Sequence, residues 1–479
     1  MWMPDRASDK TLYEQIAEHL EQRIRVGEFP PGSLLPSERR LAEQFGVNRS
    51  TVVLAFAELR SLGLIESRSG SGTMVSRPEE GAIRRHSPDW GRFADDSSFV
   101  RNPAMFRKVR EALQQIPGLI DMASGELSAD LMPTREIVDI MSRSSTLSYL
   151  GYDNPQGYPP LREALVRYLQ RLGIHTTDTS IIITSGSQQS LYLILRCLLS
   201  PGDAVAIEDP SYCYSLPMFR TAGLRVFRLP VDRHGVNPGD IRLLHKKHRI
   251  KMVFLNPNFQ NPTGALLSNE RRIQLMDLAS ELALPIVEDD PYSLTAFNGV
   301  PPAPLKAMDK AGSVIYIGSF SKIAASGLRI GWMVAPRSIV EQLADARQQM
   351  DFGLSVIPQQ VVATFLDSAG FEPHLERLRI GLQFKRDLTV DALRHKFNDR
   401  ARFWIPEGGM HLWCSIRASF SESQLLEQSI RAGFVYVPGS VHGSESGCVR
   451  LTYGRADAAD IDRGIAALRQ AVDRAEADE

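Results

Sequence analysis

The sequence predicts an α/β protein in two parts: a small N-terminal winged helix-turn-helix, and a large domain with a mostly parallel sheet and a small α+β lobe. Helical patterns broken by a tight glycine turn fill the segment from residue 11 to residue 63. Short β-rich runs later alternate with helical stretches, which is typical of an α/β domain. With 479 residues the chain is too long for one compact core, so at least two domains are expected.

The composition is that of an ordinary folded protein, with 43% hydrophobic and 23% charged residues. The 4 cysteines are scattered without the spacing of a disulfide framework or a zinc site, so we expect a reducing cytoplasmic location and no metal. The N-terminus lacks a basic and then apolar run, and no stretch of about 18 uncharged apolar residues occurs. We therefore expect a protein that is neither exported nor membrane-spanning.

The first expected helix begins after Thr11, which forms a capping-box pattern with Glu14. Apolar residues follow at four-residue spacing, and the helix is expected to end near Gly27. These apolar residues are Leu12, Ile16, Leu20 and Ile24. One face of this helix is therefore expected to be buried.

Two further helices are expected on either side of a tight turn. Ser37 is expected to cap a helix that runs through Phe45, and Gly46 supplies a left-handed stop. Asn48 is expected to cap a third helix. The apolar face of this third helix contains Val52, Phe56 and Leu59. Two helices joined by such a turn form a helix-turn-helix.

The run after Gly63, LIESRSGSGTMVS, contains two short β-type segments around glycines and predicts a hairpin, the wing of a winged helix. The charge is less favourable for nucleic acid, because residues 1–80 hold 10 basic against 12 acidic residues, a net charge of −2. Residues 36–77 hold 6 basic against 4 acidic residues, a local balance of +2. Because DNA affinity depends on which face meets the phosphates, DNA binding stays open.

Residues 77–118 show no sustained period and mix proline, glycine, serine and both charges, so we expect a linker with a docking segment. The expected organisation is therefore a winged helix at 1–76, this linker, and an α/β domain at 119–479. The α/β domain is expected to end in a smaller α+β lobe that begins near residue 353.

Polar residues follow several of the predicted strands. Gly186, Ser187 and Gln188 stand where a strand passes into a helix, and free N–H groups there favour a phosphate, although an ordinary strand-to-helix turn has the same pattern. Tyr212 follows another strand end, available to stack on a flat ring or to pack in the core. The next strand exit, NPNFQNPTG, contains Asn261 as a hydrogen-bond donor.

Three charged residues, Asp289, Lys322 and Arg329, stand at or after the later strand ends. Asp289 ends an apolar strand, where a buried carboxylate needs a cationic partner, and Tyr292 follows it. The stretch GSFSKIAASGLRIGW contains Ser319, Lys322 and, seven residues later, Arg329. Because ligands of open parallel sheets sit outside the carboxyl ends of the strands, we expect all these side chains to converge on one crevice.

In this order, the pieces resemble a fold-type I pyridoxal phosphate (PLP) aminotransferase over residues from about 119 to 479. The resemblance implies that Lys322 forms a Schiff base with the cofactor aldehyde and that Asp289 keeps the pyridine nitrogen protonated. It implies that Asn261 and Tyr292 bond the phenolic oxygen and that Tyr212 lies on the ring face. The residues implied to hold the phosphate are Gly186, Ser187, Gln188, Ser319 and Arg329.

The same resemblance extends to the neighbouring subunit and the substrate. In YLGYDNPQGYPPLREAL, Tyr152 is implied to reach the phosphate of a partner, so a homodimer is expected. In CVRLTYG, Arg450 is implied to bind the substrate carboxylate, with a rim salt bridge as the alternative. Gly125 is assigned to the same substrate or effector site.

The run from LPSERRLAEQFGVNRSTV to the glycine-rich wing resembles the GntR winged helix. By that resemblance, Arg39, Arg49, Ser50 and Thr51 face phosphates and base edges of double-stranded DNA, and Ser69 and Gly70 reach the minor groove. For Arg40 a solvated helix face remains the alternative. A GntR head joined to an aminotransferase-like body is the architecture of the MocR subfamily of bacterial regulators.

Two functions follow from this architecture. The first is a transcription regulator that binds a DNA operator and senses an amine, an amino acid or PLP itself through the cofactor. The alternative is a working aminotransferase of class I and II with an accessory DNA-binding head, because the lysine, aspartate, tyrosine and arginine of the chemistry are all present. An enzyme has no need of an intact winged helix, which favours the regulator.

Overall fold

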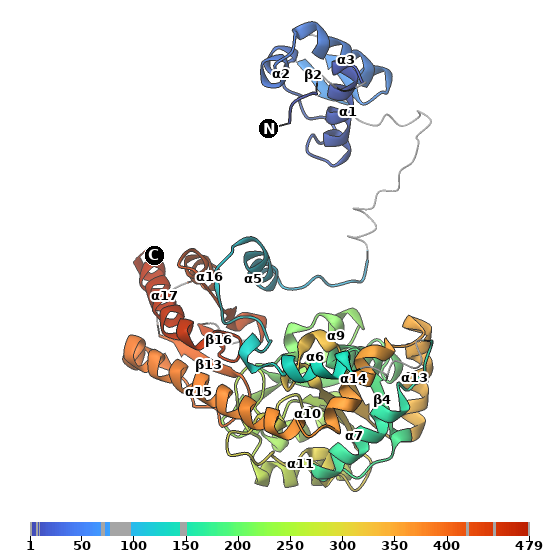
Figure 1. Ribbon diagram of the computed structural model, residues 1–479, viewed down its shortest axis with the longest axis vertical. Coiled ribbons are helices and arrows are strands. Elements are labelled where there is room, and N and C mark those ends of the chain that lie inside the picture. Colours follow the sequence, from blue (N-terminus) through green and yellow to red (C-terminus); the bar gives the residue numbers. More distant parts are fainter. Residues whose placement is uncertain are drawn as a thin grey trace. The chain divides into compact units, whose positions relative to one another are not determined.

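The structure is a computed structural model that describes residues 2–5, 8, 10–68, 72–76, 97–143, 151–417, 421–443 and 447–477. The contacts within the chain form two compact units, Met1–Ser97 and Ser98–Glu479. Figure 1 labels the main elements of both units. No helix among these described residues is long and apolar enough to cross a membrane.

The first unit contains the helices and the hairpin that the sequence predicts. Its elements are α1 (Leu12–Arg25), α2 (Glu38–Phe45), α3 (Arg49–Ser61), β1 (Ile65–Arg68) and β2 (Gly72–Val75). The capping box of Thr11 with Glu14 is present, and the Ser37 hydroxyl accepts from the Arg40 N–H at 3.3 Å. Gly46 ends α2 with φ 62°, where a glycine costs no steric strain.

One cap differs from the expectation. Asn48 occupies the N-cap position of α3, but its side chain accepts no capping hydrogen bond. Its backbone carbonyl instead accepts from the Thr51 N–H at 3.0 Å. The boundary of the helix was therefore predicted correctly, whereas the side-chain cap was wrong.

The core of the first unit joins the three helices to the hairpin. Strands β1 and β2 pair antiparallel, with Ile65 opposite Val75. The apolar faces expected from the spacing are buried together with these strands, among them Ile16, Leu20, Leu41, Phe45, Val52, Phe56 and Leu59. This packing confirms a helix-turn-helix with a wing.

The second unit is built on one large sheet. Its strands are β4 (Ile181–Thr184), β5 (Ala204–Asp209), β6 (Arg225–Asp232), β7 (Gly235–Val236), β8 (Met252–Leu255), β9 (Ile286–Asp289), β10 (Val314–Ser319) and β11 (Gly331–Val334). Their order in the sheet is β4-β11-β10-β9-β8-β5-β6-β7. Strand β11 runs antiparallel to β4 and β10, and β7 runs antiparallel to β6, while β5, β6, β8, β9 and β10 pair in parallel. The predicted mostly parallel sheet is confirmed.

Helices cover both faces of this sheet. One face is covered by α8 (Ser187–Cys197), α9 (Met218–Thr221) and α13 (Arg337–Asp351), and the other by α10 (Pro238–His248), α11 (Asn269–Leu282) and α12 (Leu305–Met308). Successive residues of β5 alternate between the two cores, since Val205 belongs to one cluster and Ala206 to the other. Burial of both faces explains why the central strands β4, β8, β10 and β11 are almost entirely apolar, whereas β6, near the edge of the sheet, is largely exposed.

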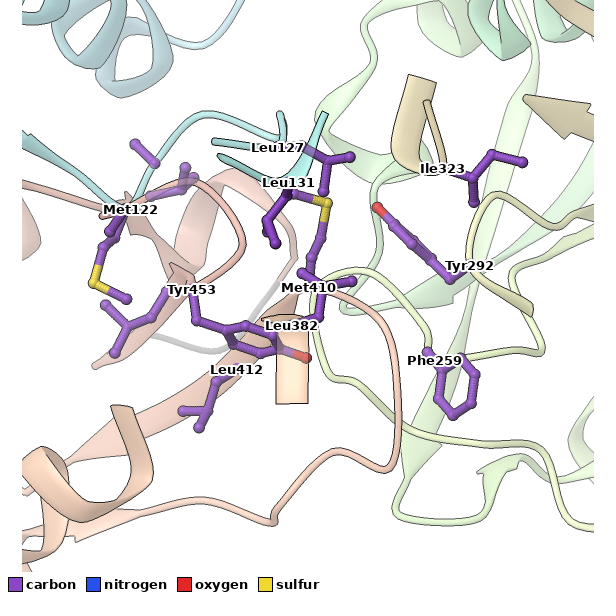
Figure 2. Packing of buried hydrophobic residues seen from close by; sticks show 14 of the residues in the cluster. Met122, Leu127, Leu131, Phe259, Tyr292, Ile323, Leu382, Met410, Leu412 and Tyr453 are labelled. Carbon is purple, nitrogen blue, oxygen red and sulfur yellow. The ribbon is translucent and has the colours of Figure 1, made fainter. Parts of the chain in front are cut away.

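The smaller lobe has its own sheet in the order β12-β13-β16-β15, formed by β12 (Ala401–Arg402), β13 (His411–Ile416), β16 (Cys448–Thr452) and β15 (Val437–Pro438). Around it lie α15 (Phe371–Phe397), α16 (Glu422–Arg431) and α17 (Ala458–Ala477). The apolar core is continuous between this lobe and the large sheet. Figure 2 shows Leu412 and Tyr453 of the lobe on one side of Met410, and Tyr292 on the other. The two lobes therefore form one folded body.

The predicted linker contains a helix, α5 (Ala104–Gln115). Its Val109 is buried in the core shared by the two lobes, and its Ala112 is also buried. The Lys108 amine lies 3.3 Å from the Glu427 carboxylate of α16. Helix α5 thus belongs to the second unit, and it is the docking segment that the sequence placed inside residues 77–118.

Candidate functional site

A cavity of about 350 Å³ lies at the carboxyl ends of the parallel strands. It brings together every residue that the sequence assigned to a cofactor or effector, except one. Those that line it are Gly125, Gly186, Ser187, Gln188, Tyr212, Asn261, Asp289, Tyr292, Ser319, Lys322, Arg329 and Arg450. The exception is Tyr152, whose side chain is 81% exposed and lies with its ring centre 6.0 Å from that of Phe352.

Lys322 stands just after β10, in the short turn Phe320–Lys322. Its Nζ donates a hydrogen bond to the carbonyl oxygen of Gly125. Removal from water, followed by the positive charge of Arg450, lowers the pKa of the Lys322 amine to about 8. A larger fraction of this amine is therefore neutral near pH 7 than of an ordinary lysine, which makes it a better nucleophile.

Asp289 ends β9, and its side chain is 8% exposed. Its Oδ1 is buried without a hydrogen-bond partner in the described part of the chain. Removal from water, together with the charge of Asp290, raises the pKa of the Asp289 carboxyl to about 7. A buried carboxylate oxygen without a partner is costly, so this position suits a cationic or N–H group of a ligand in the cavity.

The other end of the cavity suits an anion. Helix α8 begins at Ser187 after Gly186, whose φ is 88°, so the free N–H groups of its first turn face this end. The Arg329 guanidinium donates to the Ser185 carbonyl at 2.9 Å. A β-carbon added to Gly186 would approach the Arg329 Nη2 to 3.0 Å, so the guanidinium lies directly against this turn. A cation beside a helix start is an arrangement that suits a phosphate group.

The aromatic walls are fixed by hydrogen bonds. The Gln188 side chain donates to the Tyr212 hydroxyl at 2.6 Å. The Tyr292 hydroxyl lies 3.0 Å from Nε2 of His411, and burial holds the pKa of this histidine well below its usual range. Figure 2 shows Tyr292 among the residues of the shared core, near Ile323. Both tyrosines are therefore positioned by neighbours outside the strand ends.

Arg450 of β16 is 5% exposed, and burial lowers the pKa of its guanidinium to about 10. Its Nη1 donates to the Asn261 side chain at 3.2 Å and its Nη2 donates to the Ala123 carbonyl. The Nε is buried without a partner within the described ranges, and no carboxylate there forms a salt bridge with this arginine. The rim salt bridge considered from the sequence is therefore not formed, and the guanidinium is open to an anion in the cavity.

Several lining residues were not predicted. Asn256 donates to the Asp289 carbonyl at 2.8 Å and accepts from the Asn261 N–H at 2.7 Å, so it connects two predicted residues. It belongs to the same NPNFQNPTG run as Asn261, which was the available signal. Helix α5 contributes Phe106, Val109, Arg110 and Leu113. The apolar spacing of i, i+3 and i+7 in AMFRKVREALQQ was the signal for this helix.

The predicted DNA-binding residues lie on α2 and at the start of α3. Arg49 is 71% exposed and pairs with Glu38 at 3.1 Å, and Arg39 is 85% exposed and pairs with Glu43 at 3.4 Å. Ser50 is exposed and Thr51 is half-buried in the first turn of α3. The other two predicted residues, Ser69 and Gly70, lie outside the described residues.

The chain matches two known families. Residues 117–468 match the family described as aminotransferase class I and II, and residues 12–75 match the bacterial regulatory proteins of the gntR family. The chain therefore belongs to the aminotransferase class I and II family and carries a GntR domain in front of it. It is 38% identical over 473 residues to HTH-type transcriptional regulator YdfD of Bacillus subtilis, covering 97% of each chain. The domain architecture of the MocR subfamily is thus confirmed.

Solved structures resemble the second unit. The chain is 32% identical, with a TM-score of 0.75, to a kynurenine aminotransferase of Pyrococcus horikoshii, covering 81% of this chain and 98% of that one. It is 28% identical, with a TM-score of 0.72, to LysN, an α-aminoadipate aminotransferase of Thermus thermophilus, covering 79% and 96%. The fold-type I architecture predicted from the sequence is confirmed.

Proposed function

We propose that this protein is a PLP-dependent transcription regulator, which binds an operator through its winged helix and senses an amine, an amino acid or PLP itself in its aminotransferase-like body. One observation carries the proposal. A single cavity holds an amine of lowered pKa at Lys322, the unpartnered carboxylate oxygen of Asp289 and the guanidinium of Arg329, in a chain that also has a complete helix-turn-helix.

The three groups match the three ends of PLP. Lys322 would hold the cofactor covalently, Asp289 would pair with its pyridine nitrogen, and Arg329 with the start of α8 would bind its phosphate. When bound, this cofactor supplies a ring that accepts electrons. The LysN structure was solved with a phosphopyridoxyl derivative of leucine, which supports the assignment. The pyridine nitrogen of PLP would supply the partner that Asp289 Oδ1 lacks.

The winged helix would contact DNA through the start of α3. Arg49, Ser50 and Thr51 stand at its first turn, where recognition helices meet base edges and phosphates. Arg39 on α2 would add a phosphate contact. The acidic partners of both arginines are exposed or half-buried, so a phosphate can replace them at little cost.

We also propose a homodimer with shared sites. Tyr152 does not line the cavity of its own chain, and it is 81% exposed. Phe352 beside it is 67% exposed, so two large aromatic rings form a surface that a second copy could cover. Sedimentation at micromolar concentration with cofactor bound checks this, and a monomer would contradict it.

Two measurements test the function. Purified protein given PLP should absorb as a protein-bound cofactor, and borohydride should fix the cofactor mass to Lys322. A mobility-shift assay on DNA upstream of its own gene should show sequence-specific retention that responds to PLP or to amines. Protein that stays colourless would overturn the cofactor assignment. Absence of DNA retention, with turnover of an amino acid and 2-oxoglutarate, would favour the aminotransferase instead.

A further inference from the structure

Helix α5 forms one wall of the cavity. Phe106, Val109 and Leu113 are spaced i, i+3 and i+7, which places them on one helical face, and all three line the cavity. Val109 is 4% exposed and Phe106 is 38% exposed. The wall therefore runs from the buried core to the open edge and is apolar along that length.

The other lining residues fix how an amino acid would lie. An amino group directed to the Lys322 end and a carboxylate directed to Arg450 leave only the side chain free. Among the lining residues without a cofactor or carboxylate role, the large apolar ones are those of α5, while Ala123 and Ser124 are small. The space left for the side chain is therefore bounded by apolar groups.

The charges at this side of the cavity do not favour a charged side chain. Arg110 and Glu126 both line the cavity, are both exposed, and carry opposite charges. Glu126 lies close enough to raise the pKa of Lys322, so it would repel an acidic side chain near that amine. Arg110 would similarly repel a basic side chain, and each of these two residues would attract the charge that the other repels, so their effects offset each other. Neither sign of charge gains a clear partner here.

From this geometry, and resting on the proposed function, we propose that α5 is the wall that recognises the effector side chain and that the effector is an amino acid with a bulky apolar side chain. Each methylene buried against this wall increases affinity about fourfold. Leucine should therefore bind some tens of times more tightly than alanine.

The wall is held in place by both lobes. The Lys108 amine pairs with Glu427 of α16, and the segment before α5 is anchored where the Val100 N–H donates to the Thr221 hydroxyl of α9 at 3.3 Å. Among the residues that the structure describes, α5 is also the first helix after the winged helix in chain order. An effector that packs on α5 therefore acts on the segment through which the body is connected to the DNA-binding unit.

The test uses full-length protein loaded with PLP and follows the absorbance of the bound cofactor during titration with L-leucine, L-phenylalanine, L-alanine and L-glutamate. Leucine and phenylalanine should half-saturate at concentrations tens of times lower than alanine, and glutamate should be weaker than leucine. Leu113→Ala and Phe106→Ala should each reduce the leucine-to-alanine preference about tenfold, while alanine itself changes little.

Two variants control for packing. Ile116→Ala removes an apolar side chain of similar size that is 42% exposed at the end of α5 and does not line the cavity, so the preference should stay unchanged. Leu113→Met keeps the volume and should keep the preference. If alanine or glutamate is the best ligand of a coloured protein, or if the Leu113→Ala and Phe106→Ala preferences equal that of wild type, the inference is wrong. A protein that never becomes coloured with PLP would instead refute the proposed function.

Discussion

The two units treat charge in opposite ways. On the winged helix the arginines of α2 and α3 are exposed and already paired, as Arg49 is with Glu38 and Arg39 with Glu43. In the cavity of the body, Asp289 and Arg450 are buried and each keeps a polar atom without a partner in the described part of the chain. Exposed pairs contribute little and exchange easily, whereas buried unpartnered groups cost free energy until a ligand arrives. The arginines of the winged helix can therefore exchange their acidic partners for phosphates at little cost, whereas the buried groups of the cavity would be stabilised by a bound ligand.

The largest effect is expected from Lys322→Ala. Among the described residues that line the cavity, Lys322 is the only one with an amine, so borohydride should fix no cofactor mass to the variant, a complete loss. DNA retention should persist, because Lys322 and the winged helix belong to different units. The exposed Lys310 gives the matched control, and Lys310→Ala should keep both properties. If Lys322→Ala still changed its DNA binding fully with an amine, sensing would not be covalent.

Asp289→Asn should have the next largest effect. It should weaken PLP binding by about 2–5 kcal/mol, because the pyridine nitrogen loses a buried charged partner. Equilibrium binding measured by absorbance checks this. If Asp289→Asn kept full cofactor affinity, the Asp289 carboxylate would not be the partner of the pyridine nitrogen.

The same residue predicts a pH dependence. The pKa of Asp289 is about 7 in the folded cofactor-free protein and about 3.9 in an unfolded chain, so the unfolded chain loses this proton first as pH rises. The free energy of unfolding should therefore fall between about pH 4 and about pH 7 through this group. Asp289→Asn should remove that part of the fall, measured as the difference from wild type in urea unfolding. The buried acids Glu288 and Asp290 also have raised pKa values and are present in both proteins, while the raised pKa of Glu208 depends partly on the Asp289 charge, so the difference reports Asp289 together with its effect on Glu208.

Arg49→Ala tests the exposed side of the comparison. Loss of one phosphate or base contact should weaken operator binding by about 1–3 kcal/mol and leave the cofactor spectrum unchanged. A mobility-shift titration at fixed salt measures it. Arg40→Ala is the matched control, since Arg40 is exposed on α2 and was assigned a solvated face as its alternative. Equal losses in both variants would mean that only net charge matters.

The smallest effect is expected from Ser37→Ala. The serine hydroxyl caps α2, and its loss should destabilise the winged helix by about 1 kcal/mol. The thermal transition of the first unit should move while the cofactor absorbance stays constant. A change in both would show that the two units do not unfold independently.

Local patterns predicted most of the fold. The capping box at Thr11, the stop at Gly46 and the apolar strands that end near Asp289 each act within a few residues, so their positions could be derived from the sequence. Chain order then placed the strand ends at one edge of the sheet, and their convergence on one cavity followed. These parts depend on periodicity and on topology, which a sequence contains.

What could not be predicted depends on packing between distant segments. The contact of Tyr292 with His411 crosses 119 residues and joins the two lobes. The docking of α5 depends on a match with α16 that no local period reveals. The Asn48 side chain could have capped its helix, but the backbone carbonyl took that role. Such contacts depend on which residues the fold brings together, and the sequence around a single residue does not specify them.

The turn between β4 and α8 has a consequence for the kinetics of cofactor binding. A β-carbon on Gly331 would come within 2.8 Å of the Gly186 Cα, so the two backbones lie in close contact, and Arg329 holds a left-handed conformation with φ 54° beside them. This corner is stiff before any phosphate arrives, so little chain entropy is lost when one binds. The proposed cofactor should then bind without a prior change of backbone conformation, so the association rate constant should not be limited by such a change. A conformational change caused by an effector would therefore have to begin outside this turn.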